Sequence, residues 1–166
     1  MNSYNFYSKN NYTQRGTKDI IDFLSESYFV IDVQDEKDYQ KKDIDLIAID
    51  KKDIHQTYTI EIKCDSYGKK SSNYFAETIS NKNKNTLGCW LLTQSQFIAY
   101  YFPDLRELHI IKTILAQQWT REHLSELPVK KLSTNDGHGN VYYQSEGVLI
   151  DRQTLIDTIG IRVEKI

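Results

Sequence analysis

The sequence predicts an α/β (α+β) domain in which helices flank a mixed β-sheet. Residues 17–27 place apolar side chains on one face at helical spacing, so an amphipathic helix is expected there. Residues 28–33 have the composition of an apolar strand, and residues 43–50 and 57–64 alternate between apolar and polar side chains. A short polar turn separates the last two segments, which predicts an antiparallel hairpin.

The rest of the chain continues this mixture of elements. Residues 88–93 are predicted to form a buried strand, whereas residues 74–80 fit either a helix or a strand. Pro103 and Asp104 predict a second hairpin between the strands on either side of them. The remaining expected elements are strands at 97–102, 107–112 and 141–150, helices at 114–127 and 152–159, and a glycine-containing loop at 136–140.

The domain organisation is simple. The chain has no internal repeat, low-complexity linker or proline-rich boundary, and its 166 residues are enough for one core. We therefore expect one domain over residues 1–166, with a core at about 17–112 and a C-terminal elaboration at 113–166. Residues 1–14 are polar and are expected to be loosely held.

Composition excludes several classes of protein. Hydrophobic residues make up 39% of the chain and charged residues 27%, which is unlike a disordered or fibrous protein. The first residues lack the pattern of a signal peptide, and no apolar run approaches the roughly 18 residues of a membrane span, so a cytoplasmic protein without membrane contact is expected. Cys64 and Cys89 lack the spacing of a zinc or disulfide framework and are expected to be reduced core thiols.

The charges are distributed unevenly along the chain. The formal net charge is −2, which by itself argues against a strongly basic nucleic-acid binder. Residues 32–65, however, sum to −4 and residues 66–131 to +4, so an acidic block precedes a basic block. A cation site beside a phosphate-binding surface would have this distribution.

The chemically informative feature is Asp45 followed by the triplet Glu61-x-Lys63. The chain contains two other acid-x-Lys triplets in or beside polar loops, but this one lies in an apolar strand. Side chains alternate along a strand, so Glu61 and Lys63 share one face. If the hairpin turn centres near residue 53, Asp45 pairs with Glu61, and if it centres near residue 54, Asp45 pairs with Lys63. A slip that placed Asp45 on the opposite face would remove the site.

Two carboxylates and one ammonium on the same face suit metal-assisted phosphoryl chemistry. Asp45 and Glu61 offer oxygen ligands to a hard cation such as Mg²⁺, and the carbonyl of Ile62 is the expected backbone ligand. The cation would polarise a phosphoryl oxygen and lower the pKa of an attacking water. Lys63 would orient that water or neutralise developing charge. The alternative is an ordinary cross-strand ion pair of Glu61 and Lys63 on a solvated face.

The two segments that carry these residues, from Asp45 to Ala48 and from Ile60 to Lys63, resemble the motif of the PD-(D/E)XK nuclease superfamily. That superfamily has the restriction-endonuclease-like fold with an αβββαβ core, and the helix and strand predicted at 17–33 are similar to its start. The following stretch resembles phage and mobile-element members in Asp65, the run Asn73-Tyr74-Phe75-Ala76-Glu77, Gly88 and the apolar run from Trp90. The resemblance covers roughly residues 17–102.

The resemblance implies a divalent-metal-dependent endonuclease that hydrolyses DNA phosphodiester bonds. Asp45, Glu61 and Ile62 would bind Mg²⁺ or Mn²⁺, with Asp45, Glu61 and Lys63 as the catalytic residues. Asp19 in the first helix and Glu77 are auxiliary candidates.

Partners follow from the same resemblance. DNA is the expected substrate, and a homodimer is expected because a two-fold protein can cut both strands. A nucleic-acid-binding or protein-interaction module on the same fold, without catalytic activity, is the alternative. The basic residues expected to contact phosphates are Lys69, Lys70, Lys82 and Lys84.

Overall fold

The computed structural model describes residues 6–82, 84, 86–135 and 141–166. The helices are α1 (Phe6–Leu24), α2 (Lys37–Gln40), α3 (Cys89–Leu92), α4 (Thr113–His123) and α5 (Arg152–Ile159). The strands are β1 (Tyr28–Asp32), β2 (Leu46–Asp50), β3 (Thr57–Cys64), β4 (Asn73–Asn81), β5 (Thr86–Leu87), β6 (Phe97–Phe102), β7 (Glu107–Lys112), β8 (Val129–Asn135), β9 (Val141–Asp151) and β10 (Arg162–Lys165).

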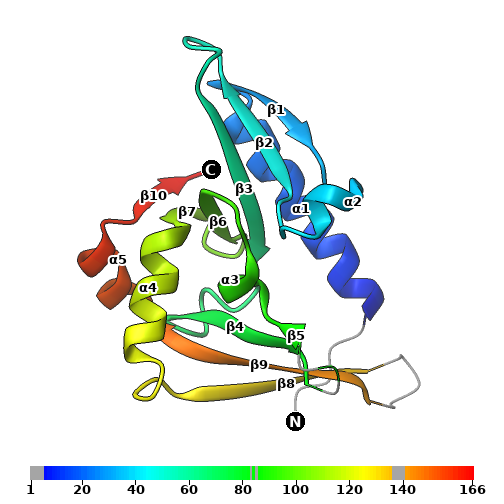
Figure 1. The fold of residues 1–166 in the computed structure, drawn as a ribbon, viewed down its shortest axis with the longest axis vertical. Helices are drawn as coiled ribbons and strands as arrows, with labels where there is room; N and C mark the ends of the chain where they lie inside the picture. Colours follow the sequence, from blue (N-terminus) through cyan, green and yellow to red (C-terminus); the bar gives the residue numbers. More distant parts are fainter. Residues whose placement is uncertain (1–5, 83, 85, 136–140) are drawn as a thin grey trace.

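The strands form two sheets (Figure 1). The larger sheet has six strands in the order β1-β2-β3-β6-β7-β10, and the smaller has four in the order β5-β4-β9-β8. Strands β3 and β6 run parallel, whereas the other neighbours in the larger sheet are antiparallel. The prediction of a mixed sheet with helices in an α+β chain is therefore confirmed.

Helix α1 covers one face of the larger sheet. Its buried Ile20 and Leu24 pack against a cluster that includes Leu46, Ile60 and Ile62 of the adjacent strands. Because side chains alternate along β3, the residues between these isoleucines point to the opposite face. Burial under α1 therefore decides which face of β3 remains for Glu61 and Lys63.

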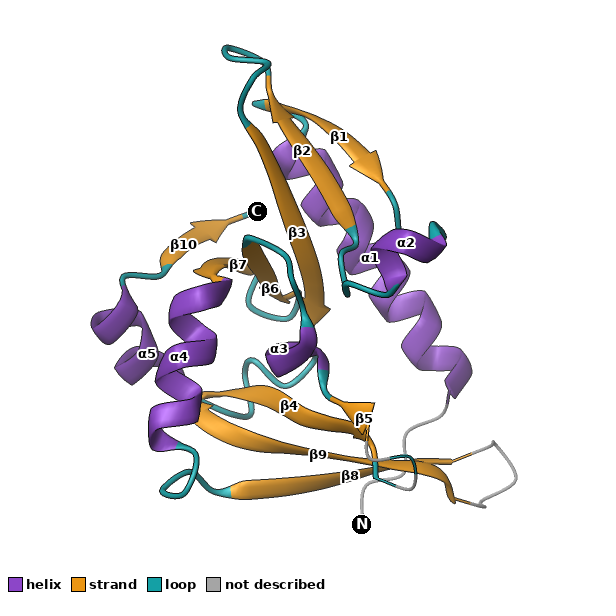
Figure 2. Cartoon of the chain, in the orientation of Figure 1, coloured by secondary structure: helices purple, strands orange, loops and turns teal. Residues whose placement is uncertain are grey.

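The opposite face packs against the smaller sheet and the remaining longer helices. Tyr100 and Phe102 of β6 share a buried cluster with Tyr74 of β4, Trp90 of α3 and Leu155 of α5. Figure 2 shows α3 lying between the end of β3 and the smaller sheet. The C-terminal third is part of this arrangement, because β9 pairs with β4 and β10 pairs with β7.

Three expected elements differ from those observed. The first helix begins at Phe6 instead of residue 17, so it includes Gly16. Glycine disfavours a helix interior, but here a Cβ would lie 2.4 Å from Cys64 Sγ, so close packing on the sheet explains its presence. Residues 89–92 form the helical turn α3 instead of a strand, because periodicity cannot assign so short an apolar run. Helix α4 ends at His123, four residues before the predicted end at 127.

The structure also decides one assignment that the sequence left open and adds elements that were not expected. The ambiguous segment at 74–80 lies in strand β4, and α2, β5, β8 and β10 were not expected. Both hairpins have the expected strands. The loop expected at 136–140 and the first five residues lie outside the described part of the chain. Among the helices that the structure describes, none combines the length and apolar character needed to cross a membrane.

A close backbone contact fixes α3 against β4. Gly88 precedes α3, and its amide donates to the carbonyl of Thr78 at 2.8 Å. A Cβ at Gly88 would lie 2.3 Å from the carbonyl oxygen of Glu77, and backbone atoms cannot move aside as a flexible side chain can. Only glycine therefore permits this approach.

We expect Gly88→Ala to lower the free energy of unfolding by about 1–3 kcal/mol, because overpacking forces α3 away from β4. Urea unfolding measures the loss, and near-ultraviolet circular dichroism should report altered aromatic packing around Trp90. Gly160→Ala is the control, because Gly160 has φ 69° and open space around it. That variant should lose about 1 kcal/mol through backbone strain and keep the aromatic signal. An unchanged stability in Gly88→Ala would contradict the close contact.

Candidate functional site

The register of β2 and β3 places Asp45 beside Glu61. Leu46 pairs with Ile60, and the amide of Asp45 donates to the carbonyl of Ile60 at 2.9 Å. Of the two registers considered above, the structure has the one in which Asp45 lies opposite Glu61. The Asp45 carboxylate also accepts a 2.7 Å hydrogen bond from the amide of Ile62, a residue beyond the paired part of β2. This bond fixes the Asp45 side chain at the end of the hairpin.

Glu61 is a buried acid among other acids. Its side chain is only 6% exposed, and burial raises its pKa to about 9, with Lys63 acting in the opposite direction and Asp45 and Asp43 adding to the increase. The carboxyl groups of Asp45 and Glu61 are close enough for each to affect the pKa of the other. Burial also raises the pKa of Asp45, although the Ile62 amide offsets part of that effect. Two neighbouring carboxylates repel each other, so a bound proton or a cation between them is favourable.

Asp43 joins this group from the turn between α2 and β2. It has φ 55°, a left-handed conformation that aspartate tolerates better than most residues. Its carbonyl accepts a 2.6 Å hydrogen bond from Thr93 Oγ1, which ties the turn to the end of α3. Burial raises the pKa of Asp43, and its Oδ2 is buried with no hydrogen-bond partner among the described residues.

Lys63 is the cation beside these acids. Its Nζ lies 3.8 Å from Glu61 Oε1, and its side chain is 34% exposed. Burial would lower the pKa of Lys63, but Cys89, Glu61 and Glu77 outweigh burial and raise it. Lys63 and the Cys89 side chain are close enough for each to affect the pKa of the other. Lys63 is therefore charged at neutral pH.

Cys89 and Glu77 complete the surroundings. Burial raises the pKa of the Cys89 thiol to about 12, although the nearby Lys63 acts in the opposite direction. Glu77 of β4 acts electrostatically on Asp43, Lys63 and Cys89. The auxiliary candidate Glu77 is therefore brought to the site.

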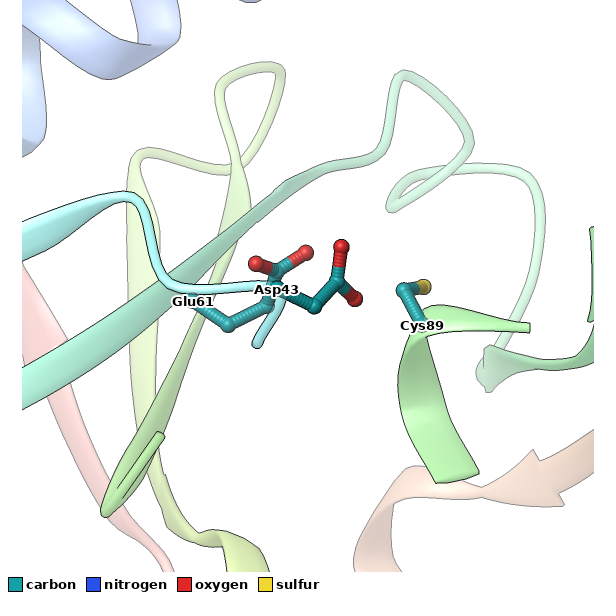
Figure 3. A group of neighbouring side chains, drawn as sticks. All are labelled: Asp43, Glu61 and Cys89. Carbon is teal, nitrogen blue, oxygen red and sulfur yellow. The ribbon is translucent and has the colours of Figure 1, made fainter. Parts of the chain in front are cut away.

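Asp43, Glu61 and Cys89 can together hold a metal ion. One potential ligand atom from each lies within 4.8 Å of the others. Figure 3 shows the Asp43 carboxyl group between the carboxyl group of Glu61 and the Cys89 side chain. The sequence interpretation named only Glu61 of these three as a ligand.

Asp19 does not join this group. It lies on α1, where its carboxylate accepts a 3.2 Å hydrogen bond from the Tyr101 hydroxyl. Ala99 and Tyr101 belong to the cluster under α1, on the face opposite Glu61. The structure therefore places Asp19 under α1, on the other face of the sheet from Glu61, and its auxiliary role stays a prediction.

The four candidate phosphate contacts lie on the surface. The Lys69 amide donates to Asp104, and Lys70 Nζ lies 5.4 Å from the centre of the Tyr67 ring. Lys82 pairs with Glu146 at 3.7 Å, and Lys84 is exposed in the turn that leads to β5. Among the described residues, none of these ammonium groups pairs with the acids of the site.

Sequence reasoning missed the roles of Asp43 and Cys89. The Asp43-x-Asp45 spacing was a usable signal, because alternate residues entering a strand share a face. Cys89 had no comparable signal. Residues 88–93 were expected to form a strand, whereas the helical turn α3 directs the Cys89 side chain to Asp43.

The raised pKa of Glu61 gives folding stability a particular pH dependence. The unfolded chain releases the Glu61 proton at the usual pKa of a glutamate, 4.5, whereas burial raises the pKa of the folded group to about 9. Without a divalent cation, the free energy of unfolding should therefore fall as pH rises between these values, by up to about 1.4 kcal/mol per pH unit for this one group. Glu61→Gln should remove that contribution and become the more stable protein at pH 8.

Urea unfolding in a chelator at pH 5.5, 7 and 8.5 measures this difference. The control is Glu26→Gln, because Glu26 is an exposed acid in the turn that follows α1. Parallel stability curves for the native protein and Glu61→Gln would show that Glu61 is ionised in the folded state.

Comparisons with family models, with curated proteins and with solved structures each found no match to this chain. The arrangement of Asp43, Asp45, Glu61, Lys63 and Cys89 is therefore the basis on which a function has to be argued.

Proposed function

We propose that the protein is a divalent-metal-dependent endonuclease that hydrolyses DNA phosphodiester bonds at the Asp45–Glu61–Lys63 site. The observation that carries this proposal is the burial of Glu61 opposite Asp45 in the hairpin and close to Asp43. Of the residues that the structure describes, Lys63 is the one cation that pairs with Glu61, so the acids outnumber the positive charges here. A divalent cation would balance that charge, and carboxylate oxygens are its preferred ligands.

Each residue of the site has a role in such a reaction. Asp45 and Glu61 would hold Mg²⁺ or Mn²⁺, and the Asp45 bond to the Ile62 amide keeps its carboxylate in place. When bound, the cation would polarise a phosphoryl oxygen and lower the pKa of a water ligand. Lys63, which is charged and partly exposed, would orient the attacking water or stabilise the negative charge that develops on the phosphate.

The order of elements supports the restriction-endonuclease-like interpretation. Helix α1, strands β1, β2 and β3, helix α3 and strand β6 follow one another in the αβββαβ sequence, and β6 adds parallel to β3. There are departures from a minimal core. Helix α2 lies between β1 and β2, strands β4 and β5 lie between β3 and α3, and α3 is a single turn.

DNA is the proposed substrate, with phosphates contacted by four exposed lysines. Lys69 and Lys70 follow the end of β3, and Lys82 and Lys84 flank the β4–β5 turn. Each lysine that neutralises a phosphate would release counterions and make binding depend on salt. A homodimer would present two such sites to the two strands of a duplex.

Cleavage assays on supercoiled, linear and single-stranded DNA test this function with Mg²⁺, Mn²⁺ or a chelator. We expect cleavage that needs the cation, and a loss of about 100-fold or more in Asp45→Asn, Glu61→Gln and Lys63→Met. The matched control for the lysine is Lys52→Met, because Lys52 is exposed in the β2–β3 turn and should retain activity.

Two outcomes would overturn the proposal. Cleavage that survives both Asp45→Asn and Lys63→Met would place the reaction elsewhere. Tight DNA binding without cleavage under any cation would favour a binding module on the same fold. Circular dichroism and thermal melting of each variant separate loss of the reaction from loss of the fold.

A further inference from the structure

We propose that Asp43, Glu61 and Cys89 form a binding site for a thiophilic divalent cation of the Zn²⁺ class. The site shares Glu61 with the catalytic arrangement proposed above, but Asp43 and Cys89 have no role in that arrangement. The inference concerns these three ligands and does not depend on DNA cleavage.

The spacing of the three groups suits one cation. Their potential ligand atoms lie within 4.8 Å of one another. A tetrahedral Zn²⁺ ion with the usual oxygen and sulfur bond lengths places its ligands roughly 3.5 Å apart. Small side-chain adjustments would therefore bring all three atoms to one ion, and Figure 3 shows the three groups already side by side.

Two unsatisfied oxygens point independently to a missing partner. Glu61 is 4% exposed, and its Oε2 is buried without a hydrogen-bond partner in the described chain. Oδ2 of Asp43 has the same status. Buried polar atoms are normally paired, and leaving a charged one unpaired is costly. A cation between these oxygens would satisfy both.

The ligands are carried by elements that hold them in place. Glu61 lies in the central strand β3, between β2 and β6. The Asp43 turn is bonded to Thr93 at the end of α3, and Cys89 opens the same helix after Gly88, which packs on the backbone of β4. The site therefore has the support from neighbouring groups that metal binding requires.

Sulfur decides the class of cation. Mg²⁺ and Ca²⁺ prefer oxygen ligands, whereas a cysteine thiolate selects Zn²⁺ and similar transition metals. Two carboxylates and one thiolate together with Lys63 and a divalent cation would be electrically neutral. Cation binding would displace to solvent the protons that the Cys89 thiol and the Glu61 carboxyl group carry at neutral pH. Three protein ligands would leave a fourth tetrahedral position for water.

The test is a titration of the chelator-treated full-length protein with Co²⁺, which replaces Zn²⁺ and reports a sulfur ligand by its charge-transfer absorption. We expect one equivalent of Co²⁺ to produce the band, Zn²⁺ to displace it, and excess Mg²⁺ to leave it unchanged. Cys89→Ser should abolish the band. Asp43→Asn should weaken binding by roughly tenfold or more, and asparagine is chosen because it tolerates the left-handed backbone.

Cys64→Ser is the matched control. Cys64 is the other free cysteine, and its sulfur faces α1 at Gly16. The proposal predicts that this variant keeps the band. Three results would each overturn the thiolate site: no band in the native protein, a band that survives Cys89→Ser, or displacement of Co²⁺ by Mg²⁺. Thermal melting without metal shows that each variant is folded.

The two proposals can fail separately. A Co²⁺–thiolate band in a protein that cleaves no DNA would support this site and count against the endonuclease. Mg²⁺-dependent cleavage that is retained in Cys89→Ser, without a band in the native protein, would support the endonuclease and count against the thiolate site.

Discussion

The structure depends on the position of β3, which is paired on both edges and packed on both faces. Ile60 and Ile62 are buried under α1, and strand geometry then directs Glu61 to the face occupied by α3 and the smaller sheet. A buried acid is unfavourable unless something compensates its charge. The surrounding contacts, from the Lys63 ammonium to the acids that approach Glu61, follow from this one placement.

The smaller sheet turns an exposed strand end into an enclosed site. A polar loop connects β3 to β4, and β4 pairs with β9. The C-terminal third therefore holds β4 in place. Glycine at position 88 lets α3 approach the β4 backbone, and Trp90 Nε1 then bonds to Thr120 Oγ1 at 2.9 Å. Without these long-range contacts, Cys89 and Glu77 would not lie near Lys63.

Local patterns predicted the parts of the fold that depend on local physics. The alternation in residues 43–64 gave the hairpin, and with it the proximity of Asp45 to Glu61. The structure then selected between two registers that differ only in turn geometry. The helical turn at Cys89 depends on distant partners, including Thr78 and Thr120, so its short apolar run carried no local signal. The left-handed Asp43 likewise depends on its link to Thr93.

The concentration of acids is better explained by binding than by stability. Replacing buried ionic groups with well-packed apolar residues is often neutral or stabilising, so a folded core does not need Glu61 beside Asp45 and Asp43. A cross-strand ion pair with Lys63 would account for one acid, but not for the oxygens of Glu61 and Asp43 that no described donor reaches. Sites that break the rules of local stability are typically functional. A bound cation would convert this electrostatic cost into affinity, because the same carboxylates that repel one another become its ligands.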